Sequence, residues 1–107
     1  MIYLDSFDSY LIHKDESILQ AIERLDENVE KTLYLIGDNG ELKASFSDGD
    51  FRRWVIKSGK LDAKVIDAAS ESLFYLNEGV ADETVFQLLK EKDLSSCPIV
   101  DAHLRIK

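Results

Sequence analysis

The chain has 107 residues, 13 of them basic and 21 acidic, so its net charge is −8. Hydrophobic residues make up 45% of it and charged residues 32%, a composition typical of a globular protein. So acidic a surface repels phosphate backbones and anionic lipid, and we expect neither nucleic acid nor a membrane as a partner. One cysteine and two histidines predict no disulfide and no metal site, and the overall expectation is a cytoplasmic protein.

The apolar pattern repeats along the chain with an offset of 64 residues. Three blocks match at this one offset: Ser9–His13 with Leu73–Asn77, Ala21–Leu25 with Val85–Leu89, and Leu35–Gly37 with Ile99–Asp101. Chance is less able to produce three matches in one register than a single match. The sequence therefore predicts two similar structural units.

The first unit is expected to begin with a strand near Tyr10–Ile12, followed by a helix that Ser17 caps. The helix is predicted because four apolar residues fall at helical spacing: Ile18, Ala21, Ile22 and Leu25. A strand at Thr32–Ile36 follows, and the Asp38-Asn39-Gly40 turn folds Leu42–Phe46 back as an antiparallel strand. A helix over Asp50–Lys57, ended by Ser58-Gly59, completes the unit.

The second unit repeats this order, with a strand near Phe74–Leu76, a helix capped by Asp82 and a strand at Cys97–Val100. The chain ends before the counterparts of Ala44–Lys57, so we expect this unit to be truncated or to continue beyond Lys107. The predicted organisation is a first unit over residues 1–59, a linker over 60–70 and a second unit over 71–107.

The segment most informative about function runs from Leu42 to Arg53 and is predicted to be a strand that leads into a helix. Ser45 and Ser47 lie two residues apart, so both hydroxyls fall on one strand face. Gly49 is expected to let the backbone turn tightly after Asp48. Hydroxyls and free amides at a helix start suit a phosphate, a fixed carboxylate suits a ribose, and two arginines, Arg52 and Arg53, follow within one turn.

A structural role explains the same residues. Asp48 is expected to cap the helix, and Asp50 adds a favourable negative charge at its N-terminal end. Ser45 and Ser47 are then ordinary strand residues. From the residues alone, capping is the favoured interpretation.

The repeat, the element order and the Ser-x-Ser-Asp-Gly-Asp-x-Arg-Arg segment resemble a tandem cystathionine β-synthase (CBS) domain pair, or Bateman module. The resemblance spans about residues 9 to 107, and its sharpest motif is the family's Gly-hydrophobic-x-Thr/Ser-x-Thr/Ser-Asp signature, met at Ala44 to Asp48. It implies an α/β (α+β) fold of two units about a pseudo-twofold axis, the second incomplete. Ala44 stands where the family has glycine, and its methyl group is expected to crowd the site.

The resemblance also implies a ligand, which is AMP, ADP, ATP or S-adenosylmethionine. Asp48 would hold the ribose, and Ser45 and Ser47 would contact phosphate. Arg52 and Arg53 would neutralise its charge. The adenine would enter an apolar slot for which Tyr75 and Leu76 are candidates. No catalytic residues and no metal are implied.

The continuation of the motif resembles CBS pairs attached to sugar-1-phosphate nucleotidyltransferases of the mannose-1-phosphate guanylyltransferase type. The implied function is a regulatory module for the attached catalytic domain, and the runner-up host is an arabinose-5-phosphate isomerase-like enzyme. The alternative is a structural module that forms a homodimer through its helices, with Phe51, Trp54 and Val55 as an apolar patch. His13 and His103 are expected to be surface residues without a ligand cluster.

Overall fold

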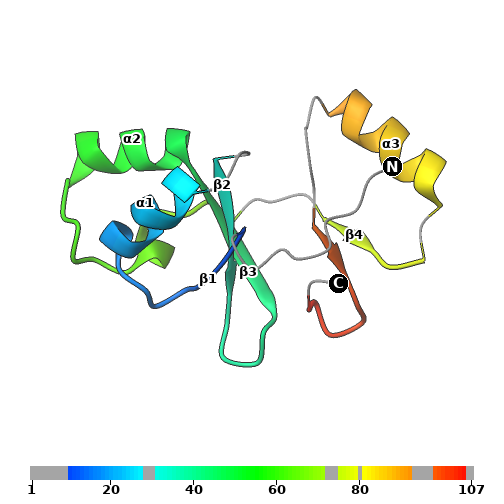
Figure 1. The fold of residues 1–107 in the computed structure, drawn as a ribbon, viewed down its shortest axis with the longest axis horizontal. Coiled ribbons are helices and arrows are strands. Elements are labelled where there is room, and N and C mark those ends of the chain that lie inside the picture. The colour runs from blue at the N-terminus through cyan, green and yellow to red at the C-terminus, as the bar shows by residue number, and fades with distance from the viewer. Residues whose placement is uncertain (1–9, 28–30, 72–74, 80, 93–97, 106–107) are drawn as a thin grey trace.

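The computed structural model describes residues 10–27, 31–71, 75–79, 81–92 and 98–105, which form two lobes (Figure 1). The first lobe contains β1 (Leu11–His13), α1 (Ile18–Glu27), β2 (Thr32–Ile36), β3 (Leu42–Ser47), α2 (Asp48–Lys57) and a short 3₁₀ helix, η2 (Val65–Asp67). The second lobe contains β4 (Leu76–Asn77), α3 (Asp82–Glu91) and β5 (Ile99–Val100).

The first lobe has a three-stranded sheet with the strand order β1-β2-β3. β1 and β2 are parallel and α1 connects them, whereas β2 and β3 are antiparallel and are joined by the expected turn at Asp38-Asn39-Gly40. Gly40 has a positive φ of 80°, which a glycine adopts without strain. The predicted elements of this lobe are confirmed, although β3 runs on to Ser47 and α2 begins at Asp48 instead of Asp50.

One face of this sheet forms the core. Strand alternation directs Leu33, Leu35, Ala44 and Phe46 toward the helices, and all four are fully buried. The core also includes Ile12 from β1, Ile18, Ala21 and Leu25 from α1, and Val65 from the 3₁₀ helix. Burying a large apolar side chain such as Phe46 stabilises the fold by about 1.5–3 kcal/mol.

Both helices of the first lobe have the ends that their sequences predict. Ser17 caps α1, because its hydroxyl accepts a hydrogen bond from the Gln20 amide at 3.2 Å and the Gln20 side chain accepts one from the Ser17 amide at 3.2 Å. At the end of α2, Gly59 has a positive φ of 73° and its amide donates to the Trp54 carbonyl at 3.0 Å. The glycine therefore ends this helix as expected.

The second lobe repeats the start of the first. β4 and β5 are parallel, α3 connects them, and Val85, Leu89 and Val100 form its buried centre. The predicted cap is wrong, because α3 has Ala81 at its N-cap and begins at Asp82. Phe74 and Cys97, expected at strand starts, lie outside the described residues. Within the described part of this lobe, β3 and α2 have no counterparts.

Residues 60–70, expected to be a linker, are built into the first lobe. Their carbonyls at Leu61 and Ala63 accept hydrogen bonds from the first amides of α1, at 3.1 and 2.9 Å. Val65 is fully buried in the core. At the end of the segment, Ser70 pairs with Ser45 through two backbone hydrogen bonds of 2.8 and 2.9 Å, which cover the outer edge of β3 at that point.

The two lobes meet through equivalent turns. In the first lobe the Gly37 amide donates to the Glu41 carbonyl at 2.9 Å, and in the second the Asp101 amide donates to the Arg105 carbonyl at 2.9 Å. Each residue of the second turn lies 64 positions after its counterpart. Glu41 and Arg105, which are counterparts, form an antiparallel bridge with each other. The predicted pseudo-twofold axis therefore passes through this bridge.

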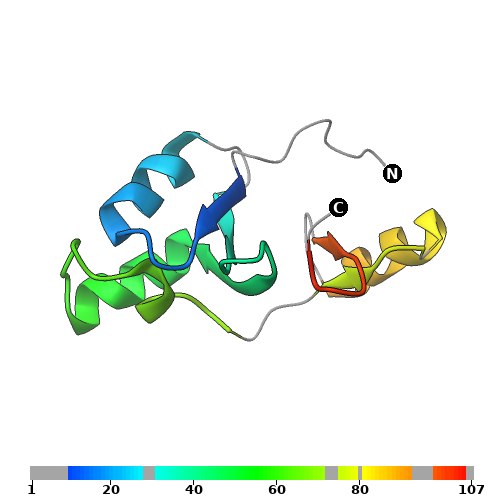
Figure 2. The same ribbon diagram turned by 90° about the horizontal axis from the view of Figure 1, so that it is seen from below.

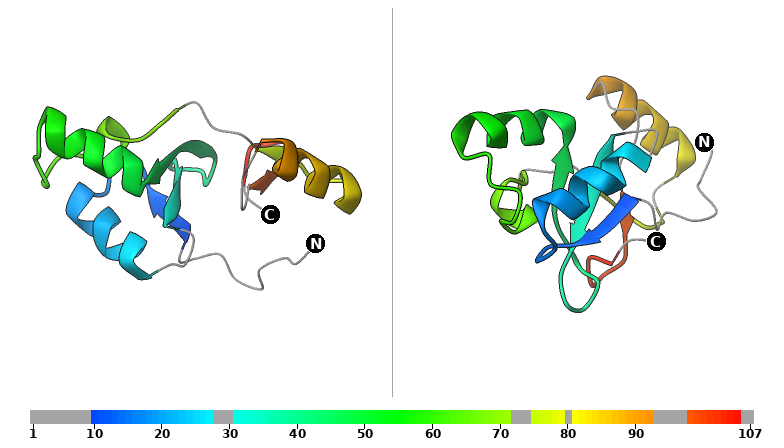
Figure 3. Two further views of the ribbon diagram at one scale, coloured as in Figure 1. Left: turned by 90° about the horizontal axis from the view of Figure 1, so that it is seen from above. Right: turned by 60° about the vertical axis from the view of Figure 1, so that its left-hand side comes forward.

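Seen from below and from above, the elements follow one another in the same order as in Figure 1 (Figure 2 and the left view of Figure 3). Helices α1 and α2 lie outside the first sheet, β4 and β5 follow, and α3 lies on the far side of the second lobe. The face of the first sheet that the helices leave uncovered is turned toward the second lobe. Among the described residues, the helices are too short or too polar to cross a lipid bilayer.

Candidate functional site

The candidate site lies where β3 ends and α2 begins. On β3, Ala44 and Phe46 are fully buried on the core side, whereas Ser45 and Ser47 are half-buried on the opposite face. Across the hairpin, Ser45 pairs with Tyr34 and Ser47 pairs with Thr32, so this face is rich in hydroxyl groups. The prediction that the two serines share a face is confirmed.

Ser47, and not Asp48, is the N-cap of α2. Its hydroxyl accepts a hydrogen bond from the Asp50 amide at 3.4 Å, and Asp50 Oδ2 accepts hydrogen bonds from the Ser47 amide at 2.9 Å and the Ser47 hydroxyl at 3.1 Å. Ser47 has extended backbone angles, whereas Asp48 is already helical, and a capping side chain must come from the residue before the first turn. The predicted cap at Asp48 is therefore wrong by one residue.

This cap leaves the Asp48 carboxylate available. Asp48 is exposed, and its carboxylate has no hydrogen bond or ion pair within the part of the chain that the structure describes. The same is true of the Arg52 guanidinium. Because these residues are four apart on α2, both side chains lie on one face of the helix and start from neighbouring positions. A carboxylate and a cation that lack partners among the described residues thus lie on one face of α2.

Arg53 is held differently. Its Nη2 donates to Asp50 Oδ1 at 2.7 Å, and the Asp50 side chain is only 10% exposed. A Cβ placed on Gly49 would lie 3.4 Å from both terminal nitrogens of Arg53, so the guanidinium folds back over the first turn of α2. Gly49 has ordinary helical geometry, with no positive φ. Its expected role in a tight turn is therefore wrong, and a Cβ at this position would only make ordinary van der Waals contact with Arg53.

The methyl group of Ala44 does not crowd the site. Ala44 is fully buried in the core cluster, on the face of β3 opposite to Ser45 and Ser47. The expected obstruction is therefore wrong, because the alternation of side chains along a strand directs this methyl group away from the site.

The two candidates for the adenine slot lie in the other lobe. Leu76 is half-buried in β4, and Tyr75, directly before it, is 39% exposed. In the described residues, hydrogen bonds and ion pairs do not connect either side chain to the β3–α2 junction. The junction thus brings together five of the seven predicted residues, namely Ser45, Ser47, Asp48, Arg52 and Arg53.

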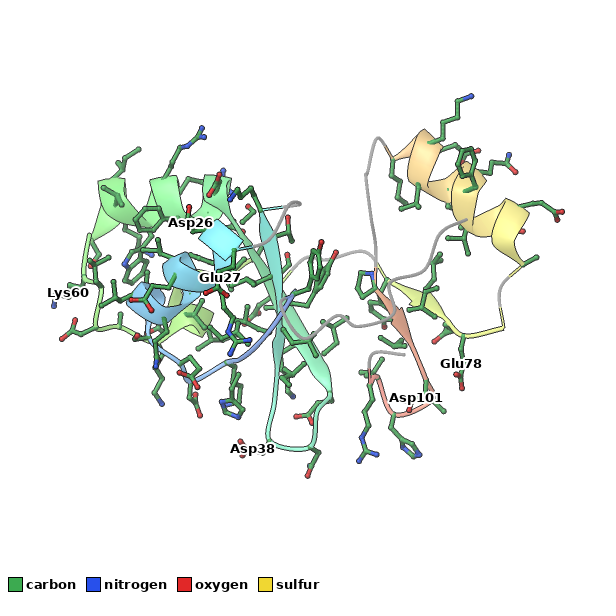
Figure 4. All side chains as sticks on the ribbon, viewed as in Figure 1. Asp26, Glu27, Asp38, Lys60, Glu78 and Asp101 are labelled. Atoms are coloured by element: carbon green, nitrogen blue, oxygen red, sulfur yellow. The ribbon has the colours of Figure 1, made fainter. Side chains whose placement is uncertain are left out.

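The sequence analysis missed a polar cluster at the opposite end of the sheet. His13 Nε2 lies 2.7 Å from Asp38 Oδ1, and the ligand atoms of His13, Asp15 and Asp38 all lie within 4.8 Å of one another. Figure 4 shows Asp38 at the tip of the hairpin. The parallel pairing of β1 and β2 could have indicated this cluster, because it brings the residues after both strands to one edge.

The contacts of this cluster, a hydrogen bond of His13 and ion pairs of Asp15, favour a structural role over metal binding. The Asp15 amide donates to His13 Nδ1 at 3.1 Å, so Nε2 carries the proton that it shares with Asp38. The Lys14 ammonium, which donates to Asp15 at 3.2 Å, holds the pKa of the Asp15 carboxyl below its usual value, and Lys64 at 3.5 Å adds to this effect. Two lysines already neutralise the carboxylate that a metal would need.

No family model matches the sequence, and no curated protein matches it. Several solved structures, in contrast, match the fold of this chain. The CBS domains of a transcriptional regulator from Streptococcus pneumoniae superpose with a TM-score of 0.75 at 14% identity, covering 94% of this chain and 81% of that one. The fold is that of a CBS-domain pair. The expected α+β class and the tandem arrangement are confirmed.

Two further solved structures that this chain resembles are nucleotide complexes. CBSX2 in complex with AMP is 25% identical, with a TM-score of 0.73, and the match covers 90% of this chain and 75% of that one. The cytosolic domain of the Mg²⁺ channel MgtE in complex with ATP is 18% identical, with a TM-score of 0.72. That match covers 92% of this chain, which spans about 40% of the MgtE domain.

Proposed function

We propose that this CBS-fold chain is a regulatory module that binds an adenine nucleotide and reports it to an attached catalytic domain. The observation that carries the proposal is the free carboxylate of Asp48 at the first residue of α2, beside the free Arg52. AMP, ADP, ATP and S-adenosylmethionine are the candidate ligands. The AMP and ATP complexes of two structures with the same fold support the adenosyl class.

Each residue has a chemical role in this proposal. The Asp48 carboxylate accepts hydrogen bonds from the two ribose hydroxyls, and acceptors of this kind suit vicinal diols. The Ser45 hydroxyl and Arg52 face the phosphate. Ser47 contributes less than expected, because its hydroxyl proton is already donated to Asp50. Tyr75 and Leu76, from the second lobe, would cover the adenine.

The signal would be a change in the relation of the two lobes. Ser45 and Asp48 belong to the first lobe and Tyr75 to the second, so a ligand held by all three favours one arrangement of the lobes. A ligand can shift such an equilibrium only by the difference in its affinity for the two arrangements. In the described residues the two equivalent turns join the lobes, through the Glu41–Arg105 bridge and the hydrogen bonds beside it. A ligand that contacts both lobes can therefore shift their relative arrangement.

Isothermal titration with AMP, ADP, ATP and S-adenosylmethionine, and with GTP as the control nucleotide, tests the proposal. We expect saturable binding of an adenosyl ligand at one site per chain, and its loss in Asp48→Ala with the fold retained. Asp62→Ala, which removes another exposed aspartate, is the matched control and should bind like the wild type. If none of the four adenosyl ligands binds, the proposal is contradicted.

The finer proposal is that the attached catalytic domain is a sugar-1-phosphate nucleotidyltransferase. It is supported by the resemblance of the Asp-Gly-Asp-x-Arg-Arg segment at residues 48–53. An arabinose-5-phosphate isomerase-like host is the runner-up. Mass spectrometry of the native polypeptide captured with an antibody against these residues identifies the catalytic domain directly, and a chain with neither enzyme would refute both.

A second candidate function is homodimer formation, and an exposed apolar surface on α2 favours it. Val55 is 51% exposed and Ile56 is 86% exposed. The patch differs from the expected one, because Phe51 and Trp54 pack against the core and the Trp54 indole donates to the Lys60 carbonyl at 2.9 Å. Figure 4 places Lys60 at the end of the first lobe remote from the second.

Sedimentation velocity tests dimer formation. A purely structural module predicts a concentration-dependent dimer that adenosyl ligands leave unchanged and that Ile56→Lys disrupts. Because Ile56 is almost fully exposed, this substitution should leave the monomer folded. A monomer at high concentration would exclude the structural function.

A further inference from the structure

We infer that the Asp48 site selects an adenosyl ligand with at most one phosphate group, and that Asp50 sets this preference by neutralising Arg53. The inference rests on the proposed function and names the class of ligand within it. Three features of the β3–α2 junction support it: the charges of the side chains there, the ion pair that one of them forms, and the donors that are left to bind phosphate.

Four charged side chains in the first two turns of α2 determine the field at the site. Asp48 and Asp50 are negative, Arg52 and Arg53 are positive, and their formal charges sum to zero. A segment with two adjacent arginines therefore offers a phosphate no net positive charge. Lys43, two residues before Ser45, adds little, because it lies 3.7 Å from Glu41 in an ion pair.

The pairing of Arg53 is the decisive feature. Its 2.7 Å bond to Asp50 is charge-assisted, and the accepting carboxylate is only 10% exposed, although the Arg53 side chain itself is 72% exposed. Asp50 cannot turn away easily, since its other oxygen accepts the two hydrogen bonds from Ser47 that begin α2. Asp50 is thus held in place by the helix cap, and Arg53 remains neutralised.

Arg52 is the cation near Asp48 that has no ion-pair partner among the described residues. The Ser45 hydroxyl is a further donor, whereas the Ser47 hydroxyl gives its proton to Asp50. Arg53 keeps other N–H groups, but the Asp50 carboxylate balances its charge. Each further phosphate group adds at least one negative charge beside Asp48 with no additional free cation. The chain's net charge of −8 opposes those charges as well.

Titration of adenosine, AMP, ADP and ATP into the full chain, in EDTA at low salt, tests this inference. In the wild type we expect AMP to bind more tightly than adenosine and ATP to bind about threefold to tenfold more weakly than AMP. Asp50→Asn keeps an acceptor for Ser47 but removes the charge and frees Arg53, so it should raise the affinity for ATP relative to AMP by a similar factor.

Two other variants keep the test decisive. Arg53→Gln leaves Asp50 without its counter-charge and should weaken the binding of ATP more than that of AMP. This variant can be used if Asp50→Asn is unstable in a thermal melt. Lys57→Gln removes a cation from the far end of α2 and should leave the AMP-to-ATP ratio unchanged.

The outcomes separate the inference from the proposed function. ATP as the tightest ligand of the wild type, or a folded Asp50→Asn with an unchanged AMP-to-ATP ratio, overturns the inference and leaves the nucleotide-binding function in place. Failure of all four ligands to bind overturns the function and the inference together.

Discussion

Glu41 and Arg105 pair with each other across the interface of the two lobes, and they are the same position of the two repeats. A residue can pair antiparallel with its own counterpart only at a twofold axis. Two further hydrogen bonds join the turns there: the Leu42 amide donates to the Leu104 carbonyl at 2.8 Å, and Arg105 Nε donates to the Asn39 carbonyl at 2.9 Å. The relation of the lobes thus depends on residues of these two turns.

The fourth position of these turns is a glycine in the first lobe and a leucine in the second. Gly40 and Leu104 both have a positive φ, of 80° and 62°, which glycine adopts freely and leucine adopts with strain of about 1–2 kcal/mol. We expect Gly40→Ala to lower the free energy of unfolding by about 1 kcal/mol. Leu104→Gly should leave it unchanged or raise it by up to about 1 kcal/mol. Urea unfolding of both variants tests these two predictions. A large decrease in the free energy of unfolding of Leu104→Gly would contradict the strain assigned to Leu104.

Acid should weaken the first of these turns. Backbone amides, first its own and then that of Asn39, hydrogen-bond the Glu41 carboxylate and hold the pKa of Glu41 below its ordinary value. A depressed folded pKa stabilises the fold above the ordinary pKa and ceases to do so as the pH falls through the folded value. The stability difference between wild type and Glu41→Gln should therefore shrink below about pH 4.3. Denaturant midpoints from pH 7 to pH 3 measure it, and a constant difference would refute it.

Replacing Ser47 and replacing Asp48 should have different effects on the free energy of unfolding. Ser47→Ala removes the N-cap of α2 and should cost about 1 kcal/mol. Asp48→Ala removes an exposed carboxylate without a partner in the described residues and should change stability by less than about 0.5 kcal/mol. Thermal unfolding followed by circular dichroism compares the two. Equal losses would mean that Asp48, after all, supports the helix.

Gly49 is expected to be replaceable. A Cβ there would meet Arg53 and the Ser47 hydroxyl at 3.4 Å or more, and the backbone has no positive φ. Gly49→Ala should therefore stabilise α2 by about 0.5–1 kcal/mol. Differential scanning calorimetry measures this, and Gly59→Ala, at a φ of 73°, is the contrasting variant that should destabilise. Destabilisation by Gly49→Ala would show that the first turn needs the glycine.

The features that the sequence predicted well depend on periodicity and on turn chemistry. The repeat predicted the pseudo-twofold axis, Asp38-Asn39-Gly40 predicted the hairpin, and Ser58-Gly59 predicted the end of α2. The orientation of Ala44 could also have been predicted, because alternation along a strand places both neighbours of Ser45, Ala44 and Phe46, on the opposite face. Leu104 could have been identified as strained from its alignment with Gly40.

Other features of the site could not be predicted from the sequence and became clear only from the structure. Serine and aspartate are both good N-caps, so the sequence could not say which of Ser47 and Asp48 precedes the first helical residue. The position of Arg53 over Gly49 depends on a side-chain rotamer that Asp50 selects. The cluster of His13 with Asp38 depends on the register of two strands. In each case the interaction joins residues whose relative position is set by an element boundary or a pairing.

The central claim, that the Asp48 carboxylate binds a ribose, is tested most directly by removing hydroxyls from the ligand and the carboxylate from the protein. AMP, 2′-deoxy-AMP and 3′-deoxy-AMP are titrated into wild type and Asp48→Ala. We expect the wild type to bind each deoxy analogue about tenfold more weakly than AMP, and Asp48→Ala to bind all three alike. Equal binding of the three by the wild type, or discrimination that persists in Asp48→Ala, would contradict the claim.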